Sequence, residues 1–572
     1  MTSIPAFAPA SDFVPAQINA ASWPELEPLY ATLVGRELHC VKCLQRLIVD
    51  RSELDAAANE ASTNLYVSMT CHTDQPEHAN AYKEFVTNVE PELKRVGFEL
   101  DRKIVSSPYA SELSDDRYGV LLRGLRAAVA LFRPENVDLQ TQEANLQQEY
   151  QTIIGAMTVE FDGQTRTIPQ MGRYQESADR AVREQAWRAV TERRLTDAER
   201  IEAIFDQLVS LRTQIAVNAG FANYRDYAMQ ARRRFDYGPV ECGAFAAGVC
   251  ESVVPASRRM MAERGTKLGV GTPRPWDTEV DVHGRGPLRP FIDGNDLFDR
   301  SLKLFEKMDP TLGELFASLR HGGHLDLESR PGKGPGGYQA TRDRTRLPFI
   351  FMNAAGLQRD VETMVHEAGH AFHALLSRAD PILAYRSEIP IEFCEVASMS
   401  MELTAHPHLG AFYSPEDAAR ARRVHLTGIA TILPWIATID RFQDWIYTNP
   451  SHTRQERKDY WVSLIASFGP GLDWSGLRQQ QELVWHRQPH LFTSPFYYIE
   501  YGIAQLGSIE LYGNFKRDSK GALAKYRDAL KLGGSRALPE LFAAAGITFD
   551  FSPAAIKRTW SAVEQDLAAL PA

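Results

Sequence analysis

Two histidines and one glutamate in the second half of the chain have the spacing of a metal site. His366 and His370 are four residues apart in the run HEAGH, and Glu367 directly follows the first histidine. On a helix, the two histidines lie about 40° apart around the axis, so both imidazoles can bind one ion. Glu367 lies about 100° from His366, where its carboxylate can act on a water molecule bound to that ion. The chain has 15 histidines, and about 3% of such chains would contain this pattern by chance.

Two more polar residues lie on the same face of this predicted helix. His373 follows His366 by seven residues, which span about 10.5 Å along a helix axis. Since one ion with bonds of about 2.1 Å cannot bind both ends of that span, we expect His373 to support the ligands or to face a substrate. Glu362 precedes His366 by one turn. It either accepts a hydrogen bond from a metal-bound imidazole or is an ordinary exposed helix charge.

A catalytic zinc ion normally has three protein ligands, and the next predicted helix offers several candidates for the third. Pro390 is typical of a helix start. The glutamates near one face of that helix are Glu388, Glu392, Glu395 and Glu402. A cation opposite these carboxylates would explain why they share one face. The spacing alone leaves Glu392 and Glu395 as equal candidates.

Helical periodicity dominates the elements that must position these residues. Apolar residues recur at three- and four-residue steps in the ranges 180–194, 197–219, 415–432 and 523–532. Alternating apolar residues predict a short strand at 346–352, just before the metal motif. We therefore expect a mainly α fold with a small β element near the site. Charged helices begin near residues 190–200, so we place a boundary there between an N-terminal part, 1–195, and a second part, 196–572.

The composition is that of an acidic globular protein. Among 572 residues, 44% are hydrophobic, and 63 Lys and Arg stand against 73 Asp and Glu, which gives a net charge of −10. This balance argues against a nucleic-acid partner, and we interpret the run Arg232–Arg234 as a solvated helix end. No segment approaches the ~18 apolar residues of a membrane span, and the N-terminal sequence does not resemble a signal peptide. We expect a cytoplasmic protein that binds no membrane.

The cysteines fit the same compartment, because six cysteines in a chain of this length do not suggest a disulfide framework. Cys40 and Cys43 form a CxxC pair within a predicted amphipathic helix that also carries Leu44 and Leu47. The sequence contains no second such pair to complete a zinc site. We therefore expect the two thiols to pack rather than to bind a metal.

The metal motif and its surroundings resemble the thimet oligopeptidase/oligoendopeptidase F family of zinc metallopeptidases, and its short bacterial oligoendopeptidase branch in particular. HEAGHAFH is followed by FCEVASMSMEL, in which Glu395 lies 25 residues after His370. In that family the third ligand is a glutamate at this distance, which implies Glu395 rather than Glu392. The family usually has Ser-Gln shortly after this ligand, whereas here Ser398 is followed by Met399.

Two further segments carry the resemblance. The run RPGKGPGGY, which ends in Gly336, Gly337 and Tyr338, is similar to the family's glycine-rich stretch. The resemblance implies that this stretch forms a wall along which a peptide backbone can come close. The run PHLFTSPFYYIEY at 489–501 is similar to the late segment in which a histidine and tyrosines line the cleft.

The second of these runs supplies the expected hydrogen-bond donors. The resemblance implies that Tyr501, Tyr498 and His490 donate to the substrate carbonyl, with Tyr497 beside them in the cleft. Tyr498 and Tyr501 are three residues apart and therefore share one helix face.

These observations predict a zinc endopeptidase that cuts short peptides. One Zn²⁺ per chain is held by His366, His370 and Glu395, and Glu367 acts as the general base. The resemblance implies a large helical zincin-type body with a deep central channel, in which residues 1–195 form one wall. Two alternatives stay open: an exopeptidase of the dipeptidyl carboxypeptidase type with the same zinc site, and a non-catalytic peptide-binding protein that has kept the zincin fold.

Overall fold

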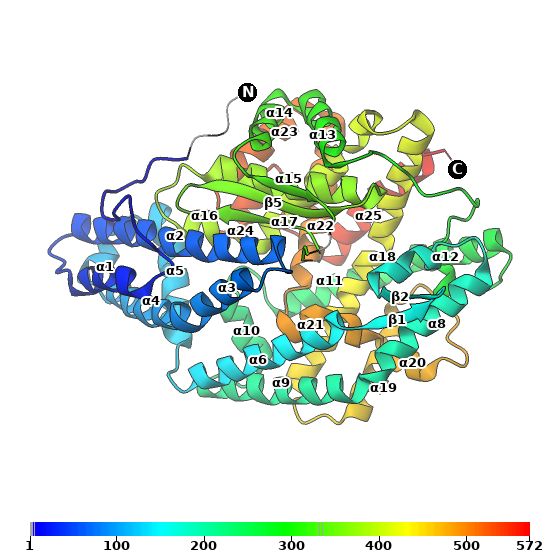
Figure 1. Ribbon diagram of the computed structural model, residues 1–572, viewed down its shortest axis with the longest axis horizontal. Helices are drawn as coiled ribbons and strands as arrows, with labels where there is room; N and C mark the ends of the chain where they lie inside the picture. Colours follow the sequence, from blue (N-terminus) through cyan, green and yellow to red (C-terminus); the bar gives the residue numbers. More distant parts are fainter. Residues whose placement is uncertain (1–3, 5, 331, 335, 572) are drawn as a thin grey trace.

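The chain folds mainly into α-helices with two small β-sheets, as Figure 1 shows. The structure is a computed structural model that describes residues 4, 6–330, 332–334 and 336–571. The mainly α fold predicted from the periodicity is confirmed. Within the described part of the chain, no helix has both the length and the apolar character that a membrane span requires. The cytoplasmic location stays a prediction.

Helices α1 to α5 lie together at one end of the molecule, at the left of Figure 1. The N-terminal helices are α1 (Trp23–Gly35), α2 (Val41–Cys71), α3 (Pro76–Asn88), α4 (Glu90–Val105), α5 (Asp115–Leu131) and α6 (Asn136–Gly155). The first five enclose their own apolar core, which is completed by Ile382 and Tyr385 from the second half of the chain. Tyr150 on α6 belongs to the larger core of the rest of the molecule. The predicted division at residue 195 stays a prediction.

Polar contacts fasten α5 to the segment 380–388 in the second half of the chain. The Arg117 guanidinium donates two hydrogen bonds to the Asp380 carboxylate, at 2.8 and 2.7 Å. The Tyr385 hydroxyl donates to the Arg117 carbonyl at 2.5 Å, and the Arg117 guanidinium lies over the Tyr385 ring. The N-terminal core is therefore fixed to the stretch of chain that leads toward Glu395.

A hairpin and further helices make up the middle of the chain. Strands β1 (Thr158–Phe161) and β2 (Gln164–Thr167) pair antiparallel across Asp162 and Gly163, which both have positive φ. An Asp-Gly pair is typical of such a two-residue turn, because its φ angles match the twist of the strands. The helices around it are α7 (Gly172–Gln175), α8 (Arg180–Thr196), α9 (Ala198–Asn218), α10 (Tyr224–Ala231), α11 (Pro239–Ser252), α12 (Val254–Leu268), α13 (Gly294–Met308) and α14 (Pro310–Ala317).

The predicted β element is the central strand of a three-stranded sheet. The strands are β3 (Leu325–Glu328), β4 (Tyr338–Arg342) and β5 (Leu347–Ala354), in the order β3-β5-β4. β5 pairs parallel with β3 and antiparallel with β4. Its residues Leu347–Met352 are all buried, because neighbours cover both faces of the central strand. The strand ends four residues before the helix that carries the metal motif.

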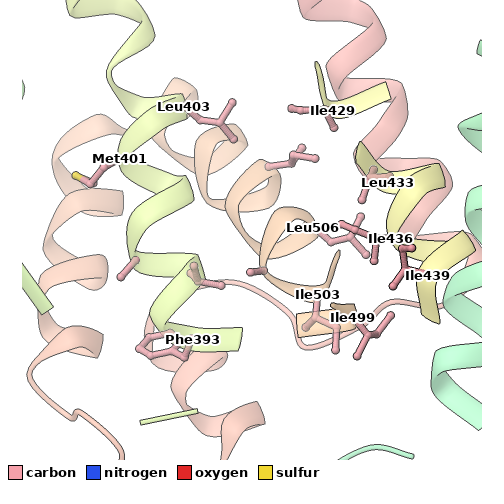
Figure 2. Close-up of a cluster of buried hydrophobic side chains, with 14 of the residues drawn as sticks. Phe393, Met401, Leu403, Ile429, Leu433, Ile436, Ile439, Ile499, Ile503 and Leu506 are labelled. Atoms are coloured by element: carbon pink, nitrogen blue, oxygen red, sulfur yellow. The ribbon is translucent and has the colours of Figure 1, made fainter. Parts of the chain in front are cut away.

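The helices after the sheet build the largest core. They are α15 (Gln358–Ser377), α16 (Ala384–Ser387), α17 (Ile391–Thr404), α18 (Pro415–Thr448), α19 (Arg454–Phe468), α20 (Arg478–Glu482), α21 (Pro489–Thr493), α22 (Ile499–Arg517), α23 (Ser519–Leu530), α24 (Leu538–Ala544) and α25 (Pro553–Ala569). Helix α17 contacts both α15 and α22. Figure 2 shows apolar side chains of α18 and α22 directed toward one another, among them Leu433, Ile436 and Ile503.

The arginine run after α10 differs from the prediction of a solvated helix end. The Arg234 side chain is only 1% exposed, and that of Arg232 is 22% exposed. Only Arg233 points outward, where it forms an ion pair with Glu388. The prediction fails because Glu500, a buried carboxylate far along the chain, attracts Arg232 and Arg234 inward.

The CxxC pair lies at the start of α2. The Cys40 sulfur caps this helix by accepting the Cys43 backbone N–H at 3.3 Å, and the two sulfurs lie 2.8 Å apart. Both cysteines are half-buried, whereas Leu44 and Leu47 of the same helix are fully buried. The leucines of this helix therefore pack into the core, whereas the two thiols lie half-buried at its N-terminus.

Candidate metal centre and active site

The structure brings together the three residues predicted as metal ligands. One ligand atom from each of His366, His370 and Glu395 lies within 4.8 Å of the other two. The Nε2 atoms of the two histidines are 3.2 Å apart, and Oε2 of Glu395 is 3.4 and 3.8 Å from them. Two imidazole nitrogens and one carboxylate oxygen that face a common point are a donor set that suits Zn²⁺.

Two helices deliver these ligands. α15 carries both histidines one turn apart, and its opposite face is buried at Met364, Ala368 and Phe372. α17 carries Glu395 and crosses α15 where the latter has Gly369. A Cβ atom at this glycine would lie 2.6 Å from the Ser398 Cα atom, so only glycine permits this approach.

Glu402 orients the first ligand. Its Oε1 atom is 2.6 Å from Nδ1 of His366, and its Oε2 atom is 3.0 Å from Nε2 of His425. Burial opposes the charge on Glu402, but the hydrogen bonds from both imidazoles lower its pKa to about 2. Since Nδ1 of His366 donates to this carboxylate, its Nε2 lone pair points toward His370 and Glu395 and is available to a cation.

The histidine pair behind Glu402 extends this chain of hydrogen bonds. Nδ1 of His425 lies 2.8 Å from Nε2 of His406. A small cavity beside them is lined by Glu362, Glu402, His406 and His425. Glu402 was predicted on the carboxylate face, but its role beside His366 was not. The available signal was its position seven residues after Glu395, two helical turns along the same face.

Glu362 and Glu392 have partners of their own. The Glu362 carboxylate accepts a hydrogen bond from Gln358 at 3.0 Å. One of the two predicted roles of Glu362 was to accept a hydrogen bond from a ligand imidazole. On His366, Glu402 fills that role. Glu392 accepts the Tyr237 hydroxyl at 2.6 Å, and burial together with the charge of Glu500 raises its pKa to about 7.

His373 lies in the core one turn after His370, and its ring makes no hydrogen bond to a ligand. Its side chain is 2% exposed, and neither ring nitrogen has a hydrogen-bond partner among the described residues. The imidazole packs edge-on against Phe393, with ring centroids 5.6 Å apart. Burial lowers the pKa of His373 to about 3, so the ring is neutral.

Glu367 sits beside the ligands on α15. Glu367 is 7% exposed, and this burial raises the pKa of its carboxyl group to about 7. The neighbouring His366 imidazole and the backbone N–H of Gln339 on β4 act in the opposite direction and lower the pKa of Glu367. A divalent cation at the three ligand atoms would also favour the carboxylate form.

The predicted donors form one aromatic cluster. The His490 ring centroid is 5.5, 5.0 and 6.0 Å from those of Tyr497, Tyr498 and Tyr501. Burial raises the pKa values of Tyr497, Tyr498 and Tyr501, and the negative charge of Glu395 acts in the same direction on Tyr497 and Tyr501. All three tyrosines therefore stay protonated and can donate hydrogen bonds.

Two residues that the sequence analysis missed fix the tautomer of His490. Nε1 of Trp435 donates to Oε1 of Gln488 at 3.0 Å. The amide nitrogen of Gln488 therefore faces Nδ1 of His490, at 2.7 Å. Because Nδ1 accepts this hydrogen bond, the proton lies on Nε2 and can be donated to another group. Burial and the nearby Arg232 lower the pKa of His490 to about 4, which keeps the ring neutral.

The glycine-rich stretch leads into the edge strand β4. Gly336 has φ +95°, and a Cβ atom at Gly337 would lie 3.2 Å from Cγ2 of Thr363 on α15. The Tyr338 ring stacks on Phe351, and its hydroxyl is 2.6 Å from the Thr70 hydroxyl on α2. Tyr338 therefore links the sheet to the N-terminal helices. Pro331 and Pro335 of this stretch lie outside the described residues.

A match to a protein-family model shows which family the chain belongs to. The model described as peptidase family M3 matches residues 173–559, which include the ligand helices and the aromatic cluster. This chain belongs to peptidase family M3. The resemblance to oligoendopeptidase F is also confirmed by its relatives.

Two curated relatives show how far the M3 similarity extends. An oligoendopeptidase F homolog of Borreliella burgdorferi is 27% identical over 265 residues, which cover 44% of this chain and 43% of the relative. An oligoendopeptidase F homolog of Lactococcus lactis subsp. lactis is 23% identical over 392 residues, 66% of this chain and 61% of the relative. The chain thus spans less than two thirds of the length of these relatives.

A solved structure shows that the M3 similarity extends over the whole fold. The structure of PZ peptidase A with inhibitor 2 has a TM-score of 0.90 to this chain at 27% identity. The match covers 98% of this chain and 99% of that one.

We expect Gly369→Ala to weaken the metal centre. The new methyl group would meet Ser398 Cα and the Ala397 carbonyl oxygen at 2.6 and 2.7 Å and would push α17 away from α15. Overpacking of this kind costs about 1–3 kcal/mol of unfolding free energy, and it displaces Glu395. Urea unfolding and competition for Zn²⁺ with a chromogenic chelator measure the two effects. Gly428→Ala is the control, because nothing lies within 4 Å of its new methyl group; equal behaviour of the two variants would contradict the expectation.

We expect His373 to contribute to acid unfolding. A group whose folded pKa is about 3, below its ordinary 6.5, gives stability that is present above pH 6.5 and lost as the pH falls toward 3. His373→Leu should therefore lose less unfolding free energy than the wild type over this pH range. The measurement is urea unfolding at several pH values, with chelator present in both proteins. Parallel pH profiles would show that His373 is not a source of the pH dependence.

Proposed function

We propose that this M3 peptidase is a zinc-dependent endopeptidase that hydrolyses internal bonds of short peptides. The convergence of His366, His370 and Glu395, with Glu367 beside them, carries the proposal. The name oligoendopeptidase F, which both curated relatives bear, supports peptides as the substrate class. We further propose that residues 1–195 and 196–572 form opposite walls of the substrate cleft.

The three ligands would hold one Zn²⁺, whose chemistry when bound is to polarise a carbonyl group and to lower the pKa of water. Glu367 is buried beside them and accepts the proton of the attacking water. The same carboxyl group then returns this proton to the amine nitrogen of the leaving product. Water attacks directly, so no residue of the chain becomes covalently attached to the substrate.

The aromatic cluster stabilises the negative charge that develops on the carbonyl oxygen. Tyr501 and Tyr498 are protonated hydroxyl donors, and His490 offers a proton on Nε2. Donors that are already oriented need no rearrangement during the reaction, and the loss of one typically costs about 10²–10³ in kcat. Tyr501 is the first candidate, because it lies in the first turn of α22, which packs against the helix α17 that carries Glu395.

We expect Glu367→Gln to keep its zinc and to lose about 10²–10⁴ in kcat/KM, because an amide cannot accept the water proton. The assay uses a quenched fluorescent peptide with both ends blocked, and mass spectrometry identifies the products. A variant that retains zinc and full activity would falsify the mechanism. Failure of the wild type to cut the blocked peptide internally would favour the exopeptidase alternative.

We expect Glu402→Gln to lower the affinity for Zn²⁺ by about 10–100-fold, because an amide has one acceptor oxygen for two imidazole N–H groups. Competition with a chromogenic chelator measures the affinity, and excess zinc should restore most of the activity. Glu362→Gln is the matched control, since its carboxylate lines the same cavity but is bonded to Gln358. If both variants bind zinc equally well, Glu402 has no special role in orienting His366.

A further inference from the structure

The segment that carries the aromatic cluster has little regular structure of its own. α21 ends at Thr493, and α22 begins at Ile499. The last carbonyl groups of a short helix have no partner within it and must find one elsewhere. Here the partners are arginine side chains from a different part of the chain. Arginine side chains accept no hydrogen bonds and act only as donors.

Arg212 on α9 holds the first half of this segment. Its side chain is fully buried. One terminal nitrogen, Nη1, donates to the Leu491 carbonyl at 3.0 Å, and the other donates to the Phe492 carbonyl. Glu143 balances the charge at 2.7 Å from Nε. The planar guanidinium thus binds two successive carbonyls at once, a geometry that a lysine ammonium does not reproduce.

Arg232 and Arg234 hold the second half. Nε of Arg232 donates to the Pro495 carbonyl at 2.8 Å, and its guanidinium lies 5.3 Å from the Tyr497 ring centroid. Nη2 of Arg234 donates to the Phe496 carbonyl and to Oε1 of Glu500, the latter at 2.7 Å. Glu500 lies in the first turn of α22, directly before Tyr501. Both ends of the connection between α21 and α22 are therefore fastened.

The conformation that these contacts hold is not one that the segment would favour alone. Phe496 has φ +64°, a left-handed conformation that costs an L-residue about 1–2 kcal/mol. Its N–H donates to Oε1 of Gln443 at 2.7 Å, and its carbonyl accepts from Arg234. Contacts on both sides of the residue thus maintain the turn. The conformation at Phe496 then sets the direction in which the side chains of Tyr497, Tyr498 and Tyr501 point.

We propose that Arg212, Arg232 and Arg234 are positioning residues that hold the His490–Tyr501 segment so that its tyrosine hydroxyls meet the substrate carbonyl. This inference rests on the proposed peptidase function. It explains why the chain places three arginines, two of them buried, next to one loop. Burying a charge is costly unless a partner and hydrogen bonds compensate it, and Glu143, Glu500 and four backbone carbonyls do so here.

A double-mutant cycle tests the inference. Arg234→Lys keeps the charge that Glu500 requires, but its shorter and more flexible side chain does not hold the Phe496 carbonyl and the Glu500 carboxylate in the fixed geometry that the planar guanidinium gives. We expect kcat on the quenched peptide to fall about tenfold or more, because small displacements of catalytic groups are costly, with a smaller change in KM. In the background of Tyr498→Phe/Tyr501→Phe, the same substitution should cost less than about twofold, because coupled residues are not additive. An equal loss in both backgrounds would show a merely structural role and overturn the proposal.

Hydrogen exchange followed by mass spectrometry gives a readout that does not depend on activity. The amides of residues 494–501 should exchange faster in Arg234→Lys than in the zinc-loaded wild type, while those of α15 stay unchanged. Arg233→Lys is the matched control, because this arginine belongs to the same run but pairs with Glu388 at the surface. Unchanged exchange in Arg234→Lys would overturn the proposal. A zinc-loaded wild type that cuts no peptide would instead overturn the proposed function, and the exchange data would still decide whether the arginines hold the segment.

Discussion

The close approach of α15 and α17 at Gly369 is the contact on which the rest of the site depends. The two histidines belong to one helix and Glu395 to the other, so the distance between the helix backbones decides whether the three ligand atoms can converge. α17 also packs against α22, whose first turn carries Tyr501. One buried helix therefore connects the ligands to the hydrogen-bond donors, and a glycine sets its position.

The glutamates predicted to share a cation have four different environments. Glu388 lies at the surface with Arg233, and Glu392 points to Tyr237. Of these four, Glu395 lies next to the Nε2 atoms of both histidines, whereas Glu402 accepts a hydrogen bond from Nδ1 of His366. Helical spacing correctly predicted that several carboxylates line α17 and the residues just before it. The partners that separate their roles come from residues more than a hundred positions away or from a neighbouring helix, and spacing carries no information about them.

Local patterns predicted the elements well, and long-range contacts explain what was missed. The apolar face of α15 and the buried strand β5 follow from periods of 3.6 and 2 residues. The Asp162-Gly163 hairpin had a local signal that was not used. The inward turn of Arg234 and the pairing of Trp435 with Gln488 had none, because each depends on a partner that only the fold brings near. For His373, helical spacing gave the correct face but not its burial against Phe393.

The fastening of α5 to the segment 380–388 constrains how the molecule can move. Arg117, Asp380 and Tyr385 join the N-terminal helices to the chain only a few residues before α17. The Thr70 hydroxyl on α2 also meets the Tyr338 hydroxyl on β4, and Arg346, directly before β5, pairs with Glu53 on α2. The N-terminal helices are thus held both to the sheet that precedes α15 and to the chain that precedes α17. A displacement of these helices would therefore act on both ligand helices at once.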